Sequence, residues 1–183
     1  DDPSSDAQYA RTSSTSWCNV HSCLQDPTFL SVRERISALT NVPWQNSEHL
    51  QLLQYATGQF YTEHHDQIAP RYSTWGPRLY TFFMYLSSPE EGGQTRFTKL
   101  NITVEPVKGS AILWPSVYST DPFETDHRTY HEAVPVTKGV KFAANFWQHM
   151  FDFQGPLDRG CDNKNYLQKA SLSNPTVPFS AYR

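Results

Sequence analysis

The sequence predicts a mainly β protein, built as a barrel or a double-sheet jelly roll. Thirteen prolines, 14% aromatic residues and few long runs of helical periodicity favour strands and loops over helices. Strands bounded by Gly and Pro, without helices between them, are not typical of alternating βαβ units. The predicted strands are short apolar or aromatic runs at 50–56, 60–66, 79–86, 110–114 and 140–150.

The length and charge of the chain restrict its organisation and its partners. With 183 residues, the chain fits a single domain over 1–183. Its 15 basic and 18 acidic residues give a formal net charge of −3, which is too even to predict binding to nucleic acid or to an acidic membrane. No apolar stretch approaches the roughly 20 residues of a membrane helix, so we expect no membrane contact.

Within this domain we expect a core of about 27–150 between less regular ends. Residues 1–26 are rich in Ser, Thr, Asp and Asn, which predicts an irregular N-terminal segment. Asp26-Pro27 then begins a helix in which apolar residues recur every three to four positions, and Pro43 ends it. Residues 155–183 lose this periodicity and predict a surface tail.

Two signals favour the secretory pathway, in the lumen of the endoplasmic reticulum or Golgi. Cys18 and Cys23 are spaced so that a disulfide can join them, which leaves Cys161 unpaired by count. The triplet beginning at Asn101 is a glycosylation acceptor. Because the chain begins with Asp1, a signal peptide or anchor can have preceded it. The alternative is a pair of free thiols and a chance triplet in a cytosolic protein.

The stretch YTEHHD, residues 61–66, contains a candidate metal-binding pattern. On an extended strand His64 and Asp66 share one face, while His65 points away. An imidazole with a carboxylate is a good ligand set for iron(II), and a third ligand on one side leaves positions open for substrate and oxygen. Taken alone, the pattern also fits a solvated pair at the end of a strand.

The second half of the chain offers another imidazole and a lysine. His131 precedes an apolar strand, and Lys141 follows it by ten residues. Lysine is almost never buried without a charged partner, so this face is either open to solvent or pairs Lys141 with a ligand carboxylate. A zinc site of His127 and His131 needs a helix, whereas the segment looks extended, and we reject it. If 140–149 is a strand, one face carries Lys141, Ala143, Asn145 and Trp147.

Over about residues 10–150 the chain resembles the prolyl 4-hydroxylase catalytic domain, within the iron(II)/2-oxoglutarate-dependent dioxygenase superfamily. Any one matching segment can arise by chance, but five in this order form a specific combination. They are RTSS at 11–14, LLQYATGQFYTEHHD at 52–66, RLYTFFMYLSSPEEGGQTRF at 78–97, VKGSAILW at 107–114 and HEAVPVTKGVKFAANFWQH at 131–149.

The resemblance implies a double-stranded β-helix, a jelly-roll barrel that holds iron in its mouth. It implies that His64, Asp66 and His131 are the iron ligands, and that Lys141 anchors the distal carboxylate of 2-oxoglutarate. Catalysis would depend on these four residues together.

Five further positions match family positions around the co-substrate and the substrate. Tyr55 and Thr95 match residues that add hydrogen bonds to the distal carboxylate of 2-oxoglutarate. Tyr61, Arg78 and Trp147 match residues that line the substrate channel, although aromatic residues on barrel strands often serve packing alone.

The implied activity is hydroxylation of peptidyl proline to 4-hydroxyproline, as in procollagen-proline 4-dioxygenases, with 2-oxoglutarate converted to succinate and carbon dioxide. It requires Fe(2+), 2-oxoglutarate, O2 and L-ascorbate, and a proline-containing peptide or protein as substrate. Lys141 favours the prolyl branch, because lysyl hydroxylases tend to carry Arg there. The alternatives are a same-fold hydroxylase of lysine or a small molecule, and an inactive barrel that only binds. Departures at Gln67-Ile68, Ser110 and Val134 leave the preferred peptide open.

Overall fold

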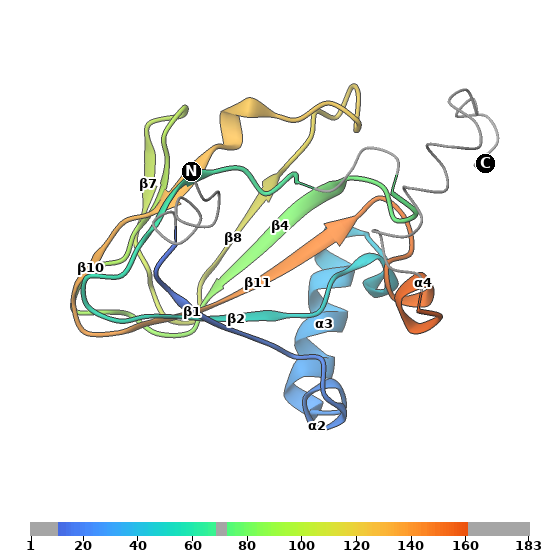
Figure 1. The fold of residues 1–183 in the computed structure, drawn as a ribbon, viewed down its shortest axis with the longest axis horizontal. Helices are drawn as coiled ribbons and strands as arrows, with labels where there is room; N and C mark the ends of the chain where they lie inside the picture. The colour runs from blue at the N-terminus through green and yellow to red at the C-terminus, as the bar shows by residue number, and fades with distance from the viewer. Residues whose placement is uncertain (1–10, 69–72, 161–183) are drawn as a thin grey trace, which may run out of the picture.

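Two antiparallel sheets form the body of the molecule in a computed structural model that describes residues 11–68 and 73–160 (Figure 1). The larger sheet has the order β1 (Ser14–Trp17), β2 (Gln51–Tyr55), β11 (Lys141–His149), β4 (Arg78–Tyr85) and β8 (Ala111–Pro115). The smaller sheet has the order β3 (Tyr61–His64), β9 (His131–Ala133), β6 (Thr95–Phe97) and β7 (Ile102–Val104). A third ladder pairs β10 (Val136–Lys138) with β5 (Glu91–Gly92).

The space between the two sheets is the hydrophobic core. Both sheets contribute to one cluster of buried side chains, and partly buried residues of β3, β7 and β9 pack against it. Residues that alternate along each strand point to the same side, so every second residue enters this core. The cluster comprises Leu53, Tyr55, Phe83, Tyr85, Phe97, Trp114, Val136 and Ala143.

Helix α3 (Pro27–Thr40) lies across one face of the larger sheet (Figure 1). The carboxylate of Asp26 accepts hydrogen bonds from the first free backbone N–H groups of the helix, and Pro27 occupies its first turn. Asn41, with a φ of 55°, ends it in the left-handed conformation. The predicted helix is therefore confirmed. The shorter helices are α2 (His21–Leu24), η1 (Trp44–Asn46), η2 (His127–Thr129) and α4 (Gln154–Asp158).

Each predicted strand has a counterpart, with one correction that concerns the candidate site. The strand predicted at 60–66 ends at His64, so Asp66 lies beyond β3 in a bend. Its buried carboxylate reaches the centre because the chain turns there, and not because it alternates with His64 along a strand.

The expectation of an irregular segment at 1–26 is wrong for its described part. Residues 14–17 form β1, which pairs with β2 along its whole length. All four side chains of β1 are exposed, so the segment has no alternation to mark it as a strand. A disulfide between Cys18 and Cys23 then joins the end of this segment to α2, a pairing that the sequence allowed but left open.

The predicted tail at 155–183 is also corrected where the structure describes it. Helix α4 covers its beginning, and Pro156 is buried there. Residues from 161 onward, with Cys161, lie outside the described residues.

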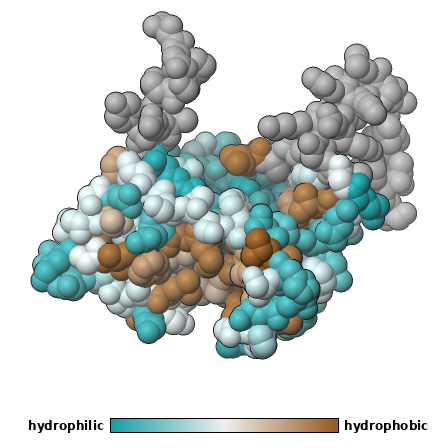
Figure 2. All heavy atoms as spheres, turned by 60° about the horizontal axis from the view of Figure 1, so that its bottom comes forward, coloured by the Kyte–Doolittle hydropathy of each residue, from teal (hydrophilic) through white to brown (hydrophobic). Residues whose placement is uncertain are grey.

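The surface carries a concentration of apolar side chains on one side. Figure 2 shows them gathered on the face turned forward from the bottom of Figure 1. Exposed apolar residues of the larger sheet include Leu113 on β8 and Phe142 on β11. No helix within 11–68 and 73–160 combines the length and the apolar character needed to cross a bilayer.

Candidate metal centre

Two imidazoles and one carboxylate converge at the end of the smaller sheet. His64 on β3 and His131 on β9 are direct cross-strand partners, which brings together residues that are far apart in the sequence. His64 Nε2 lies 3.9 Å from Asp66 Oδ1, and His131 Nε2 lies 3.7 Å from Asp66 Oδ2. One candidate ligand atom from each residue lies within 4.8 Å of the others.

The orientation of both imidazole rings is fixed by the backbone. His64 Nδ1 lies 2.8 Å from the carbonyl oxygen of Thr62, and His131 Nδ1 lies 2.9 Å from that of Thr129. A carbonyl can only accept, so each Nδ1 carries a proton, which leaves Nε2 as the nitrogen through which a neutral ring binds metal. This is the arrangement that metal-ligating histidines adopt in proteins.

Asp66 is held both through its carboxylate and through its backbone oxygen. The hydroxyl of Thr81, a fully buried residue of β4, donates to Asp66 Oδ2 at 2.6 Å. Arg78 Nη1 donates to the backbone oxygen of Asp66 at 2.9 Å, which fixes the bend after β3. His65, as expected, points elsewhere: its Nε2 lies 3.0 Å from Thr129 Oγ1 and from a backbone oxygen of the η2 turn.

The protonation states suit a divalent metal. Burial, together with the neighbouring His131, lowers the pKa of His64 to about 4, so this ring is neutral at pH 7. Burial acts to raise the pKa of Asp66, but His131, His64 and the Thr81 hydrogen bond outweigh it and hold the pKa below its usual value. Neutral imidazole and ionised carboxylate are the forms that bind metal. Two histidines and one carboxylate on one side of a site match the donor set of non-haem iron(II) oxygenases.

Lys141 lies inside the barrel on β11, with no exposed surface. Its Nζ donates to the backbone oxygen of Gly93 at 2.7 Å and lies 5.2–5.3 Å from the ring centres of Tyr55, Phe83 and Tyr85. Within the described part of the chain no carboxylate forms a salt bridge with it, and burial lowers its pKa to about 7. A buried ammonium in this position therefore lacks the charged partner that such groups need.

A cavity of about 230 Å³ connects the metal-ligand cluster with the rings around Lys141. Tyr55, Phe83 and Thr95 line it, and the ring centres of Tyr55 and Phe83 lie 5.2 Å from Lys141 Nζ, although Lys141 is not itself part of the lining. Thr95 Oγ1 accepts a hydrogen bond from the Tyr85 hydroxyl at 2.8 Å, so its own proton is free to donate. The other predicted site residues in the lining are His64, Asp66, His131, Tyr61, Arg78 and Trp147.

The predicted channel residues have distinct surroundings. The Tyr61 ring stacks on His64 with centres 3.6 Å apart. The guanidinium of Arg78 lies over the Trp147 ring, 4.1 Å from its centre. The indole Nε1 of Trp147 is buried and has no hydrogen-bond partner among the described residues.

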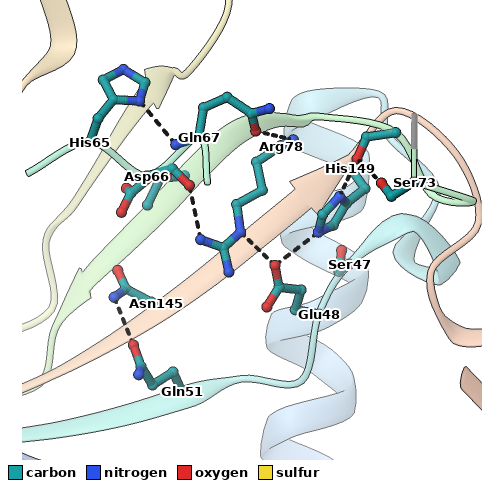
Figure 3. Close-up of polar contacts among 12 residues, drawn as sticks. Ser47, Glu48, Gln51, His65, Asp66, Gln67, Ser73, Arg78, Asn145 and His149 are labelled. Carbon is teal, nitrogen blue, oxygen red and sulfur yellow. Dashed lines mark hydrogen bonds and ion pairs between the residues drawn. The ribbon is translucent and has the colours of Figure 1, made fainter. Parts of the chain in front are cut away.

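Arg78 also belongs to a buried polar network that the sequence did not reveal. Figure 3 shows its side chain extended between Asp66 and Glu48, with His149 on the far side of Glu48. Arg78 Nε donates to Glu48 Oε1 at 2.5 Å, and His149 Nε2 lies 2.8 Å from the same oxygen. Burial opposes ionisation of Glu48, but His149 and Arg78 lower its pKa to about 2. The network ties β4 and β11 to the bend that carries Asp66.

Thr81, Tyr85 and Glu48 are thus site residues that sequence reasoning missed. Thr81 and Tyr85 lie on β4, and only the pairing of this strand with β11 and β8 shows which of its side chains face the site. Glu48 precedes β2 and joins the site through its contact with Arg78. Arg11, in the RTSS segment, also lines the cavity and lies over the Tyr61 ring, 5.2 Å from its centre. The only sequence feature that could have indicated Arg11 was the match of the RTSS segment to the family.

The comparison with known families agrees with this geometry. The sequence model of the 2OG-Fe(II) oxygenase superfamily matches residues 50–149, which is more than half of the chain and contains all four of His64, Asp66, His131 and Lys141. The chain belongs to the 2OG-Fe(II) oxygenase superfamily. The resemblance on which the sequence predictions rested is therefore confirmed.

Curated relatives of this oxygenase are prolyl 4-hydroxylase subunits. Subunit alpha-2 of Gallus gallus is 35% identical over 143 residues, which cover 76% of this chain and 26% of that protein. Subunit alpha-3 of Bos taurus is 37% identical over 140 residues, which cover 72% of this chain and 25% of that protein. The oxygenase chain thus spans about a quarter of the length of these relatives.

Solved structures confirm the predicted fold. A viral collagen prolyl hydroxylase of Paramecium bursaria Chlorella virus-1, solved as a 2OG complex, has a TM-score of 0.62 and 29% identity, covering 76% of this chain and 80% of that one. A prolyl-4-hydroxylase of Pseudomonas putida has a TM-score of 0.55 and 21% identity, over 78% and 74% of the two chains, and supports the fold alone. The mainly β double-stranded β-helix is therefore the architecture of this oxygenase.

Proposed function

We propose that this chain is a single catalytic domain that hydroxylates peptidyl proline at the fourth ring carbon. The observation that carries the proposal is the convergence of His64, Asp66 and His131 in the wall of a cavity. The buried ammonium of Lys141, which has no carboxylate partner among the described residues, lies next to Tyr55 and Phe83 of the same wall. The prolyl 4-hydroxylase relatives support proline as the target residue.

His64, Asp66 and His131 hold the iron(II) ion in this proposal. Their fixed Nε2 lone pairs and the Thr81-bound carboxylate present ligands from one side, which leaves the opposite side for co-substrate and oxygen. When bound, iron would supply oxidising chemistry with 2-oxoglutarate and O2: one atom of O2 enters a C–H bond and the other enters succinate, with release of carbon dioxide. L-ascorbate would keep the ion in its iron(II) form.

Lys141 binds the distal carboxylate of 2-oxoglutarate and thereby gains the charged partner that it lacks. In this proposal Thr95 donates the proton left free by its bond from Tyr85. Tyr55, whose ring centre lies 5.2 Å from Lys141 Nζ, adds a second hydrogen bond to the same carboxylate. The surrounding rings exclude water, which strengthens this charge-assisted contact.

In this proposal a proline-containing peptide enters the cavity that Tyr61, Arg78 and Trp147 help to line. The unpartnered indole N–H of Trp147 can donate to a peptide carbonyl. Arg78 acts differently from a free cation, because its Nε and Nη1 are already engaged by Glu48 and Asp66. It fixes the backbone bend that carries Asp66 and packs against the Trp147 ring.

The proposed location is the secretory pathway, in the lumen of the endoplasmic reticulum or Golgi. The disulfide between Cys18 and Cys23 supports it, because such bonds persist in oxidising compartments.

A peptide assay with mass detection tests the proposed activity. The protein is incubated with proline-rich and lysine-containing peptides, and iron(II) or 2-oxoglutarate is omitted in turn. We expect a gain of one oxygen atom on proline that requires both. His64→Ala should abolish it, while His127→Ala, at an exposed position, should retain it. Oxygen gained on lysine, or full activity in His64→Ala, contradicts the proposal.

A further inference from the structure

Asn101 lies at the tip of the turn that joins β6 to β7, a part of the molecule that the proposed reaction does not use. Residues 98–101 form the turn, and Asn101 closes it with a φ of 54°. Its side chain is exposed, and β7 is the last strand in the order of the smaller sheet, at one side of the molecule in Figure 1. A positive φ suits Asn in a tight turn, so the backbone of the turn accommodates Asn101 without strain.

The chemistry of an N-glycosylation acceptor is complete at this turn. The acceptor pattern needs an Asn amide and a hydroxyl two residues later, and Asn101-Ile102-Thr103 supplies both on exposed positions. Within 11–68 and 73–160 neither side chain has a hydrogen-bond partner. The only other Asn-x-Thr or Asn-x-Ser triplet in the sequence is Asn174-Pro175-Thr176, and its proline excludes it.

A second observation points to the compartment where this modification occurs. The disulfide between Cys18 and Cys23 closes in the fold, with the Cα atoms 5.4 Å apart, and Cys18 is buried. Structural disulfides form in the oxidising lumen that also glycosylates Asn-x-Thr triplets. The triplet and the disulfide are independent features of the chain, and both indicate the same route.

The surroundings of Asn101 explain what a glycan would do. Leu100 and Ile102, on either side of it, are 43% and 48% exposed. Ile102 begins β7, which pairs with β6 on one side only among the described strands. The free backbone groups of an edge strand with exposed apolar residues can pair with a strand of another molecule and cause aggregation. Proteins protect such edges with charged residues, proline or a covering group.

We propose that Asn101 carries an N-linked glycan that covers the open edge of β7. The glycan shields Leu100 and Ile102 from solvent and blocks edge-to-edge association of folded molecules. This inference depends on passage through the secretory pathway and not on iron, 2-oxoglutarate or proline hydroxylation.

Expression with a signal peptide in a eukaryotic secretory host tests the modification. Wild-type protein should show one discrete mobility shift that an N-glycosidase removes. Asn101→Gln and Thr103→Ala should lose the shift, whereas Thr103→Ser preserves the acceptor and should retain it. Secreted wild-type protein with the Cys18–Cys23 disulfide formed but no glycan on Asn101 would overturn the proposal.

Trimming the glycan from folded wild-type protein tests its role without a folding step. An endoglycosidase that leaves a single sugar on Asn101 removes the cover but keeps the residue. We expect severalfold faster aggregation of the trimmed protein by light scattering, with unchanged circular dichroism. Equal aggregation rates would refute the shielding role. Because the readouts involve no catalysis, their failure is distinguishable from failure of the proposed hydroxylase activity.

Discussion

The proposed contact of Lys141 with 2-oxoglutarate predicts that co-substrate binding depends on pH in a defined direction. Burial lowers the pKa of Lys141 to about 7 in the ligand-free protein, so a large share of molecules carry a neutral amine at neutral pH. A carboxylate bound beside Nζ requires the ammonium form. Binding must therefore take up a proton whenever the pH exceeds the free-protein pKa of Lys141.

The magnitude follows from that pKa. The apparent dissociation constant for 2-oxoglutarate should be nearly constant below pH 6.5, about 11-fold higher at pH 8 and about 100-fold higher at pH 9. Each tenfold loss corresponds to about 1.4 kcal/mol of binding free energy. At pH 8 about 0.9 proton should enter the complex for each co-substrate bound. The carboxylates of 2-oxoglutarate titrate well below this range and do not contribute.

Calorimetric titration of 2-oxoglutarate into anaerobic iron(II)-loaded protein measures both quantities. Buffers of different ionisation enthalpy give the number of protons taken up between pH 6 and 9. Lys141→Arg is the matched control, because its guanidinium stays charged throughout this range and should flatten the pH dependence whatever its absolute affinity. A wild-type affinity that does not change with pH, or equal slopes for the two proteins, would refute the reasoning.

Three other perturbations test the packing of the site. Lys141→Met should stabilise the ligand-free protein at pH 7 by up to about 4 kcal/mol, because the lowered pKa means that burial of the ammonium costs folding free energy below pH 10.5. Thermal melting should show a higher Tm for the variant. An unchanged Tm would contradict the lowered pKa. Gly92→Ala should destabilise the fold by about 3 kcal/mol or more, because a Cβ there overlaps the backbone oxygen that precedes β10. Gly58 also has a positive φ but faces open space, so Gly58→Ala should cost only about 1 kcal/mol. Equal losses of unfolding free energy in urea would contradict the overlap. Thr81→Val should weaken iron(II) or manganese(II) binding by about tenfold or more, because it removes the hydrogen bond to Asp66. Thr81→Ser keeps the hydroxyl and should bind metal with close to wild-type affinity. A metal titration in which the valine variant binds as tightly as wild type would refute the positioning role.

Local signals in the sequence sufficed for the elements that local chemistry controls. Asp26 and Pro27 at the start of α3, and Asn41 at its end, act through their own backbone and nearest neighbours, so the helix could be predicted almost to its bounds. The alternation along β11 likewise placed Lys141, Ala143 and Asn145 on one face before the fold was known, and the pairing with β2 and β4 confirms it.

Other features of the site depended on contacts between distant segments. Asp66 was predicted on the same strand as His64 but reaches the cluster from a bend, which Arg78 and Thr81 fix from another sheet. Strand β1 escaped prediction because its partner is β2, and a solvent-exposed edge strand needs no apolar alternation of its own.

The sequence by itself determined the family, the mainly β class and the residue types of the candidate centre: two imidazoles, a carboxylate and a lysine in a specific order along the chain. Only the tertiary structure decided that His64 and His131 stand opposite each other across two strands, that Lys141 is fully buried without a carboxylate partner, and that Glu48 and His149 support the centre through Arg78. The physical reason is that side-chain chemistry and alternation are local, whereas burial, strand register and hydrogen-bond partners depend on which distant segments pack together.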